Sequence, residues 1–377
     1  MPPLHVLIKP ASSACDLSCR YCFYKDVSEH RKDSFSGMLS KEAMSDILAK
    51  TMEAAEGSVT YAFQGGEPTL AGLDFFRDLI KMQEEYARPG LTVYNTIQTN
   101  GCSITPEWAQ FLAENHFLVG LSLDGSKEVH DINRVNAAGE GSWKRVMETV
   151  RLFDRYGVDY NILSVVTSQN ARRIQSTYSF FKKQNFRWLQ FIPCLEPLDA
   201  VRGEAAYALT PEAYADFLIT VFDLWMTDLS KGEYISIRHI DNWVGMLLGR
   251  PPEACSMTGR CSVQFVIEGD GSVYPCDFYV LDEWRLGNIR SDSIRSMLES
   301  DTARRFLAAS CRIPDECRAC PLFPLCRNGC RRDRLTAPDG FPDRNYYCES
   351  FRKFFRERAK ELEEAAGLII QMNSDGV

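Results

Sequence analysis

Three cysteines close together near the N-terminus are the first residues that could do chemistry. Cys15, Cys19 and Cys22 have the spacing C-x3-C-x2-C. Three thiolates on one loop can hold three corners of a [4Fe–4S] cube and leave the fourth iron without a protein ligand, open to a small cofactor. A zinc site is the alternative, but structural zinc prefers four closed ligands. His30 lies in a polar segment, where we expect it to be solvated.

A larger group of cysteines lies in the last third of the chain. Eight of them are enough for two complete tetrathiolate sites, and C-x2-C pairs are suited to chelating one metal. These eight are Cys255, Cys261, Cys276, Cys317, Cys320, Cys326, Cys330 and Cys348. We favour two iron–sulfur clusters, with two zinc ribbons as the alternative, and spacing alone does not assign a cysteine to either site. We expect buried free thiols at the remaining Cys102, Cys194 and Cys311.

The composition limits the partners and the cellular compartment that we expect for this protein. A net charge of −8 would repel a phosphate backbone, so we expect no nucleic-acid partner. No apolar stretch approaches the roughly 18 residues that span a bilayer, and no secretory signal opens the chain, so we expect a cytoplasmic protein without a membrane partner. In a reducing compartment the 14 cysteines favour metal or cluster binding over disulfides.

The first half of the chain alternates short apolar runs with longer amphipathic segments. Strands are predicted at 6–9, 59–63, 91–98, 118–123, 159–165 and 186–191. Helices are predicted near 40–55, 73–87, 105–115, 142–156 and 170–184, with N-caps at Ser40, Thr105 and Ser142. Strands joined by helical crossovers form a parallel sheet. We therefore predict an α/β fold, a partial (βα)6 barrel of TIM type, with an open doubly wound sheet as the alternative.

The pattern changes after the sixth predicted strand. A long helix is predicted near 210–230, and a hairpin at 264–275, where Gly269-Asp270-Gly271 forms the turn. Strands then become few and cysteines dense, so we divide the chain into a barrel domain, 1–234, and a cysteine-rich domain, 235–377. The tail from about 364 carries no signal that we can interpret.

The first cysteine loop resembles the signature of radical S-adenosylmethionine (SAM) enzymes. In that family the open iron binds the cofactor, whose reductive cleavage yields a 5′-deoxyadenosyl radical. The resemblance implies that glycines after the second strand let the cofactor approach, that Glu67 meets its ammonium and that Arg134 pairs with its carboxylate. The implied cofactor-binding residues are Tyr21, Tyr24, Gln64, Gly65, Gly66, Glu67, Ser122, Asp124, Arg134 and Leu195. The alternatives without a cofactor are a purely structural tight turn at 65–68 and a surface charge at Arg134.

The order of the later cysteines resembles the SPASM extension of radical SAM enzymes that modify peptides and proteins. This resemblance implies two auxiliary [4Fe–4S] clusters, and so three clusters in all. One would be held by Cys255, Cys261, Cys276 and Cys330, and the other by Cys317, Cys320, Cys326 and Cys348. Full ligation by protein suits electron transfer rather than substrate chelation.

Across nearly the whole chain the resemblance is to the anaerobic sulfatase-maturating enzymes. The segments that carry it are 8–13, 22–24, 62–72, 98–101 and 274–279, while Asn328 stands where a Gly-Gly-Cys is expected. These enzymes oxidise a cysteine or serine of a sulfatase, in a Cys/Ser-x-Pro/Ala-x-Arg segment, to Cα-formylglycine. The resemblance implies the sulfatase polypeptide as one partner and an electron donor such as a ferredoxin or flavodoxin as another.

The implied reaction needs a base, and Asp277, next to Cys276, is the candidate. After hydrogen abstraction from the substrate Cβ, Asp277 would take the thiol or hydroxyl proton and the auxiliary clusters would accept the remaining electron. A carboxylate is a weak base, so burial would have to strengthen it; the alternative is a solvated acid at the end of the hairpin. The residues expected to bind the substrate peptide are Gln64, Gln98, Asn100 and Tyr24.

Two other functions remain open from the sequence. A SPASM enzyme could instead form a thioether crosslink in a peptide, although that route commonly uses a precursor-binding domain and the predicted barrel starts at residue 6. An iron–sulfur electron carrier without catalysis would not require the glycine turn, Ser122 or Arg134. Consumption of SAM distinguishes the carrier from both enzymes.

Overall fold

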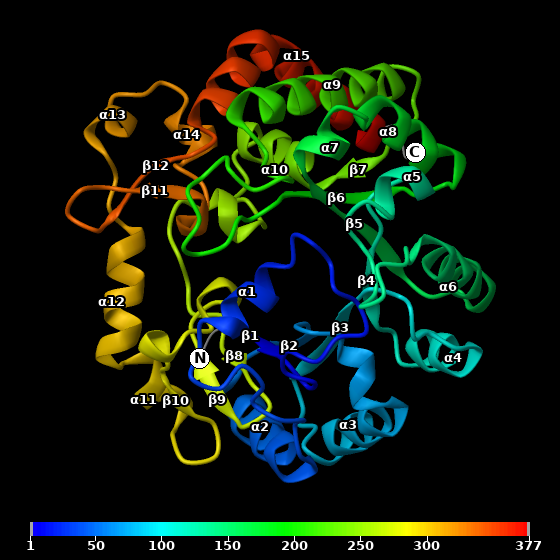
Figure 1. Ribbon diagram of the computed structural model, residues 1–377, viewed down its shortest axis with the longest axis vertical. Helices are drawn as coiled ribbons and strands as arrows, with labels where there is room; N and C mark the ends of the chain where they lie inside the picture. Colours follow the sequence, from blue (N-terminus) through cyan, green and yellow to red (C-terminus); the bar gives the residue numbers. More distant parts are fainter. Residues whose placement is uncertain (1–2, 375–377) are drawn as a thin grey trace. The chain divides into compact units, whose positions relative to one another are not determined.

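The computed structural model describes residues 3–374 and comprises two compact units that interleave along the chain (Figure 1). The first unit contains the residues up to Leu123, then Asp131–Tyr160 and Ser262–Phe306. The second contains Asp124–His130, Asn161–Cys261 and the residues from Leu307 onward. The domain division predicted at residue 234 stays a prediction.

The first unit is built on a sheet with four consecutive parallel strands. These are β1 (Leu4–Ile8), β2 (Ser58–Phe63), β3 (Thr92–Thr99) and β4 (Leu118–Ser122). Beyond β1 the sheet continues with β8 (Val266–Ile267), β9 (Ser272–Tyr274) and β10 (Gly287–Asn288). Strand β8 is parallel to β1 and antiparallel to β9, which confirms the predicted hairpin. A late segment of the chain therefore lies beside the strand that precedes the first cysteine loop.

Helices connect these strands, and all but the first of them lie outside the sheet (Figure 1). They are α1 (Phe23–Glu29), α2 (Lys41–Ala54), α3 (Leu73–Glu85), α4 (Pro106–Glu114), α6 (Trp143–Tyr156), α11 (Ile294–Leu298) and α12 (Asp301–Ser310). Ser40 and Thr105 cap α2 and α4 as predicted. Ser142 stands at the predicted N-cap position of α6, but its side chain makes no capping bond, and its hydroxyl donates to Arg134 O at 2.9 Å. The sequence analysis did not predict α1.

An aromatic cluster fills the space between this sheet and its helices. The rings of Phe63 and Phe76 lie 5.0 Å apart, and Trp108 lies 5.3 Å from Phe76. These side chains are almost fully buried, and each buried aromatic removes a large apolar area from water. The cluster thus fixes α3 and α4 against β2.

The second unit has three parallel strands and a larger share of helix. The strands are β5 (Tyr160–Val166), β6 (Trp188–Pro193) and β7 (Ser236–Ile237). The helices are α5 (Lys127–His130), α7 (Ser168–Ala171), α8 (Ile174–Lys183), α9 (Pro211–Leu229), α10 (Arg238–Leu247), α13 (Asp315–Arg318), α14 (Phe323–Cys326) and α15 (Cys348–Ser374). A separate antiparallel pair is formed by β11 (Arg334–Thr336) and β12 (Pro342–Asn345). The helix predicted at 170–184 is divided into α7 and α8.

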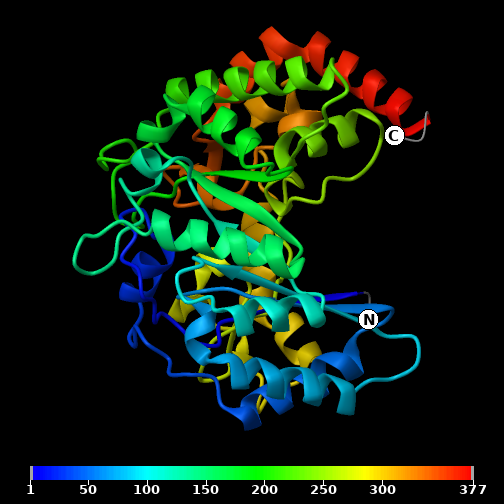
Figure 2. The ribbon, with the colours of Figure 1, turned by 90° about the vertical axis from the view of Figure 1, so that its right-hand side faces the viewer.

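The last helix, α15, lies side by side with α9 (Figures 1 and 2). Its Phe354 stacks on Trp243 of α10 at 4.8 Å and meets Phe222 of α9 edge-on at 5.5 Å. The tail from about 364, which we left without an interpretation, continues this helix because Ala365 and Ala366 are buried against its neighbours. Between residues 3 and 374, no helix combines the length and the apolar character needed to cross a membrane.

Candidate active site and cluster-binding residues

The loop that carries the first three cysteines follows β1 and ends where α1 begins. Cys22 is the N-cap of α1, and its sulfur accepts a hydrogen bond from Lys25 N at 3.4 Å. The sulfur of Cys15 accepts one from Leu17 N at the same distance. Backbone donors aimed at cysteine sulfur stabilise thiolates and tune a bound iron–sulfur cluster. The donor set, three thiolates with Cys19 as the third, fits a cube with one open corner.

Asn100, at the end of β3, is tied to this cysteine loop. Its side-chain nitrogen donates to Asp16 Oδ1 at 2.6 Å and lies 3.8 Å from the sulfur of Cys15. Ser103 also donates to Asp16, at 3.0 Å. Asp16 was not singled out in the sequence, because an acid between two cysteines looks like an ordinary loop residue. The structure shows that it joins the loop to the carboxyl end of β3.

The turn after β2 packs directly on the cysteine loop. Gly65 and Gly66 have φ values of +104° and +53°. A Cβ at Gly66 would lie 2.2 Å from the carbonyl oxygen of Ala14, so only glycine fits. Glu67 N donates to that same carbonyl at 2.7 Å. The two glycines therefore allow the loops after β1 and β2 to meet.

The carboxylate of Glu67 is buried and accepts four hydrogen bonds. The donors are the backbone N and hydroxyl of Thr69, at 3.1 and 2.8 Å, the hydroxyl of Thr99 at 2.7 Å and Asn100 N at 2.8 Å. Burial raises the pKa of Glu67, and these hydrogen bonds oppose that rise. The side chain thus holds the ends of β2 and β3 together, a role that the sequence analysis did not assign to it.

The other predicted cofactor residues are divided between the two units. In the first unit, Gln98 Nε2 donates to Ser122 Oγ at 3.1 Å, and the Arg134 guanidinium lies 5.5 Å from the ring centre of Tyr21. Arg134 is only 6% exposed, so it is not a surface charge. In the second unit, Asp124 accepts a hydrogen bond from Val165 N at 3.0 Å. Leu195 of the same unit is buried just past β6.

Asp277 lies in the first unit, at the start of a 3₁₀ helix, Asp277–Tyr279. Its side chain is 8% exposed, which rules out the alternative of a solvated hairpin acid. One carboxylate oxygen forms an ion pair with Lys9, and the other accepts a hydrogen bond from Gln64 Nε2 at 2.8 Å. Gln64, predicted to bind both cofactor and substrate, is thereby placed beside the predicted base.

A second buried ionic group adjoins Lys9. The Lys9 ammonium lies 3.6 Å from the ring centre of Tyr24, and the Tyr24 hydroxyl donates to Glu268. Glu268 in turn pairs with Arg31. Burial, followed by the charge of Glu268, raises the pKa of Tyr24. The sequence analysis missed Lys9, Arg31 and Glu268, although a charge within or beside an apolar strand, as at Lys9 and Glu268, is a signal that could have found them.

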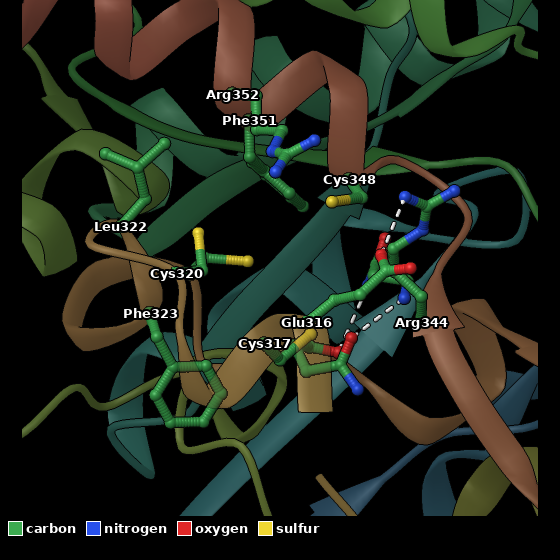
Figure 3. Close-up of a pocket in the computed structure, with 12 residues that line it drawn as sticks. Glu316, Cys317, Cys320, Leu322, Phe323, Arg344, Cys348, Phe351 and Arg352 are labelled. Carbon is green, nitrogen blue, oxygen red and sulfur yellow. Dashed lines mark hydrogen bonds and ion pairs between the residues drawn. The ribbon is translucent and has the colours of Figure 1, made fainter. Parts of the chain in front are cut away.

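Four of the later cysteines line one pocket of the second unit (Figure 3). They are Cys317, Cys320, Cys326 and Cys348, the set that the resemblance assigns to one auxiliary cluster. Cys317 lies in α13, Cys326 ends α14 and Cys348 begins α15. Apolar walls come from Leu322, Phe323 and Phe351. Four thiols facing one apolar-lined space fit a fully ligated [4Fe–4S] cluster.

The other predicted set is divided between the units, with Cys276 in the first and Cys255, Cys261 and Cys330 in the second. The sulfur of Cys330 accepts a hydrogen bond from Arg332 N at 3.4 Å. Burial raises the pKa of Cys261.

Arg334 supports the segments that carry these second-unit cysteines. Its guanidinium donates to four backbone carbonyls at 2.7–3.1 Å, those of Gly259, Ser310, Asn328 and Gly329. Three of these residues, Gly259, Asn328 and Gly329, lie within two positions of a predicted ligand. Sequence reasoning missed Arg334, because its four partners are spread over the chain.

The cysteines outside the predicted sets have unlike surroundings. Cys194 is buried as expected, Cys102 is half-buried and Cys311 is exposed, so the expectation of three buried thiols is wrong for the last two. Every cysteine is a free thiol. Within residues 3–374, no three His, Cys, Asp or Glu side chains have the geometry of a single-ion site. An iron–sulfur cube is wider than one ion, so its thiolates attach farther apart.

Comparisons with known proteins agree with the class that this fold and these cysteine sets define. Residues 10–181 match the radical SAM superfamily, and residues 255–321 match the SPASM iron–sulfur cluster-binding domain. The chain is 45% identical to the cysteine-type anaerobic sulfatase-maturating enzyme of Clostridium perfringens, over 98% of this chain and 100% of that one. It is 31% identical to the serine-type enzyme of Bacteroides thetaiotaomicron, over 96% and 91% of the two chains.

A solved structure extends the agreement to three dimensions. Native anSMEcpe, with bound AdoMet and a Cp18Cys peptide, superimposes with a TM-score of 0.94 at 43% identity, over 98% of this chain and 100% of that one. The chain belongs to the anaerobic sulfatase-maturating enzymes of the radical SAM class. Membership confirms the predicted α/β fold with a C-terminal SPASM domain and the predicted cofactors, S-adenosylmethionine and three [4Fe–4S] clusters.

Proposed function

We propose that this enzyme oxidises a cysteine of a sulfatase polypeptide to Cα-formylglycine. Its identity to the cysteine-type relative, 45%, exceeds its identity to the serine-type relative, 31%, and supports cysteine as the target. The similar solved structure holds the Cp18Cys peptide, which supports a segment of the Cys-x-Pro-x-Arg type as substrate. The buried Asp277 carboxylate beside Cys276, held by two side chains, is the observation that carries the proposal.

In this proposal Cys15, Cys19 and Cys22 hold the catalytic cluster. The bound groups supply a 5′-deoxyadenosyl radical at this site and electron acceptance at the two auxiliary sites. The residues assigned to SAM are Tyr21, Tyr24, Gln64, Gly65, Gly66, Glu67, Ser122, Asp124, Arg134 and Leu195. Burial of Arg134 supports its assignment to the cofactor carboxylate, since a charge-assisted bond is stronger away from water.

Asp277 takes the proton of the substrate thiol. A general base must lie within hydrogen-bond reach of that proton with a lone pair directed at it, and each carboxylate oxygen keeps a lone pair beyond the one used by Lys9 or Gln64. Burial keeps water from competing for those lone pairs. Asp277 is therefore suited to act once the hydrogen on the substrate Cβ has been removed.

The substrate backbone is held by amide side chains at the ends of the first-unit strands. Gln64 and Gln98 each carry an amide with donors and acceptors beyond the bonds that they make to Asp277 and Ser122, and Asn100 Oδ1 keeps a lone pair beyond its bond from Cys102 N. An extended peptide offers the complementary backbone groups. Tyr24 is the last residue assigned to the substrate. Its ring contacts the Lys9 ammonium, which pairs with the Asp277 carboxylate that Gln64 also binds.

The remaining parts of the proposal concern the two domains, the reductant and the compartment. The barrel, 1–234, would carry the catalytic cluster and the SPASM domain, 235–377, the two auxiliary sets. The two sets of four cysteines, each able to ligate a cluster fully, support electron transfer with a one-electron donor of the ferredoxin or flavodoxin kind. Cysteines assigned to clusters rather than to disulfides support a reducing, cytoplasmic location.

The test is anaerobic incubation of the reconstituted enzyme with reductant, SAM and a peptide containing Cys-x-Pro-x-Arg. Mass spectrometry should find formylglycine together with 5′-deoxyadenosine, and a matched peptide with serine in place of cysteine should react more slowly. An intramolecular thioether would instead identify a crosslinking enzyme. Absence of 5′-deoxyadenosine would indicate that the protein is an electron carrier without catalysis.

A further inference from the structure

The lysine that follows β1 is fully buried and has no part in the proposed function. Lys9 is 0% exposed, and lysine is almost never fully buried unless its charge is paired. Removing an ammonium from water costs several kcal/mol that only a well-placed partner offsets. Its partner is Asp277, 268 residues away along the chain.

Three contacts fix where the Lys9 ammonium lies. The backbone N of Lys9 donates to Ile267 O at 2.9 Å, which ties the residue to the hairpin that precedes Asp277. The ammonium lies 3.6 Å from the ring centre of Tyr24, a cation–π contact. At Gly65 a Cβ would lie 2.5 Å from Lys9 Nζ, so the glycine leaves the room that the lysine side chain occupies.

The Asp277 carboxylate is consequently held at two points. Lys9 binds Oδ1 and Gln64 binds Oδ2, from the ends of two neighbouring strands, β1 and β2. Two contacts on different oxygens fix both the position and the plane of a carboxylate, whereas Gln64 alone would leave it free to rotate. A base that is displaced by about 1 Å can lose on the order of a hundredfold in rate.

We infer that Lys9 is a positioning residue, which holds the Asp277 carboxylate in the orientation that accepts the substrate proton. The inference rests on the proposed function, in which Asp277 is the base. It predicts that loss of the Lys9 charge leaves SAM cleavage intact and uncouples it from product formation. If Lys9 served only to stabilise the fold, its substitution would lower SAM cleavage and product formation together, because folded protein or clusters would be lost.

The first experiment compares Lys9→Met with the wild-type holoenzyme. Met keeps a similar length without the ammonium, and we expect the ratio of formylglycine to 5′-deoxyadenosine to fall roughly ten- to a hundredfold, with kcat lowered and the peptide KM little changed. Iron content and thermal midpoint are measured in parallel. If Lys9→Met does not retain its iron, Lys9→Gln, which keeps a donor at the site, replaces it under the same criterion.

Lys50→Met is the matched control. Its ammonium is also held within the first unit, but by the backbone carbonyls of Ile289, Arg290 and Asp292 rather than by a carboxylate. The control should keep the wild-type ratio. An equal fall in both variants would contradict a specific role for Lys9.

The decisive experiment places Lys9→Met in the Asp277→Asn background. If Lys9 acts through Asp277, the double variant is no worse than Asp277→Asn alone, since the positioned group is already gone. A further loss as large as that in the wild-type background would overturn the inference. Wild-type enzyme that makes no formylglycine would overturn the proposed function as well, whereas wild-type activity with an unchanged ratio in Lys9→Met would overturn only the role of Lys9.

Discussion

Arg31 and Glu268 form an ion pair 2.6 Å long, with side chains that are 1% and 0% exposed. Glu268 directly follows β8, and Arg31 follows α1, so the pair fastens the late hairpin to the segment behind the first cysteine loop. Tyr24 donates to the same oxygen of Glu268. Such a pair is costly to break because the remaining partner becomes a buried, uncompensated charge.

Glu268→Gln should therefore destabilise the protein by about 3 kcal/mol or more. Denaturant unfolding of the reconstituted enzyme measures the change, with Glu299→Gln as the control. Glu299 pairs with Arg295 on the surface of α11, where ion pairs contribute at most about 1 kcal/mol. Equal changes in the free energy of unfolding for the two substitutions would show that the buried pair stabilises the protein no more than the surface pair does.

Asp277→Asn keeps the size of the side chain but removes its ability to take a proton. We expect SAM cleavage to survive and formylglycine to fall by roughly 10²- to 10⁴-fold, the usual contribution of a general base. Asp282→Asn is the control, because Asp282 lies nearby in the chain and its carboxylate accepts from Lys32 N at the surface. Product formed at the normal rate by Asp277→Asn would exclude Asp277 as the base.

Cys317→Ala should remove one auxiliary cluster. Its sulfur belongs to the four that line the pocket of Figure 3, and a cube with three protein ligands in a site built for four is expected to be lost or degraded. Iron analysis should show a fall of about one cluster in three, with slower product formation. Cys311→Ala, at an exposed cysteine outside both sets, should keep the full iron content.

Gly66→Ala tests the turn that packs on the cysteine loop. The added Cβ would meet two backbone carbonyls, those of Ala14 at 2.2 Å and Ser12 at 2.7 Å, which cannot rotate away as a side chain could. We expect loss of SAM binding, measured by equilibrium dialysis. Gly57→Ala also has a positive φ, +75°, but nothing lies within 4 Å, so it should cost only about 1 kcal/mol of stability and leave binding intact.

Arg334→Gln should loosen the second-unit segments that carry Cys261 and Cys330. The guanidinium satisfies four carbonyls, and a glutamine amide cannot reach them all. We expect a lower thermal midpoint and faster iron loss in the presence of a chelator. Arg312→Gln, which breaks an exposed pair with Asp339, should change neither, and iron loss at the wild-type rate in Arg334→Gln would contradict the supporting role.

Local patterns in the sequence predicted the strands well. All six strands predicted in the first half are present within about two residues of their expected bounds, because each is a short apolar run between turn residues. Helices whose apolar face depends on distant partners were harder to predict. The whole of α15 was missed, since its burial depends on α9 and α10, more than a hundred residues away along the chain.

Two hydrogen-bonding details, at Ser142 and Glu67, also depend on tertiary contacts. Ser142 has the right residue type and stands at the N-cap position, but its backbone is helical rather than extended, and its hydroxyl accepts no capping bond. Glu67 stays a predicted cofactor residue, but the sequence did not reveal that four donors from the ends of β2 and β3 also surround its carboxylate. Competing partners of this kind are invisible until the strands are aligned.

The amino-acid sequence by itself identified the groups of cysteines, the α/β class and the family resemblance, but its spacing did not assign the eight later cysteines to one site or the other. Cys15, Cys19 and Cys22, the proposed ligands of the catalytic cluster, lie on one short loop, so their spacing already contains the geometry that chelation needs. Tertiary structure alone decided what surrounds Asp277. Lys9 reaches it across 268 residues only because β8 pairs with β1, and no local pattern encodes a contact made by strand pairing.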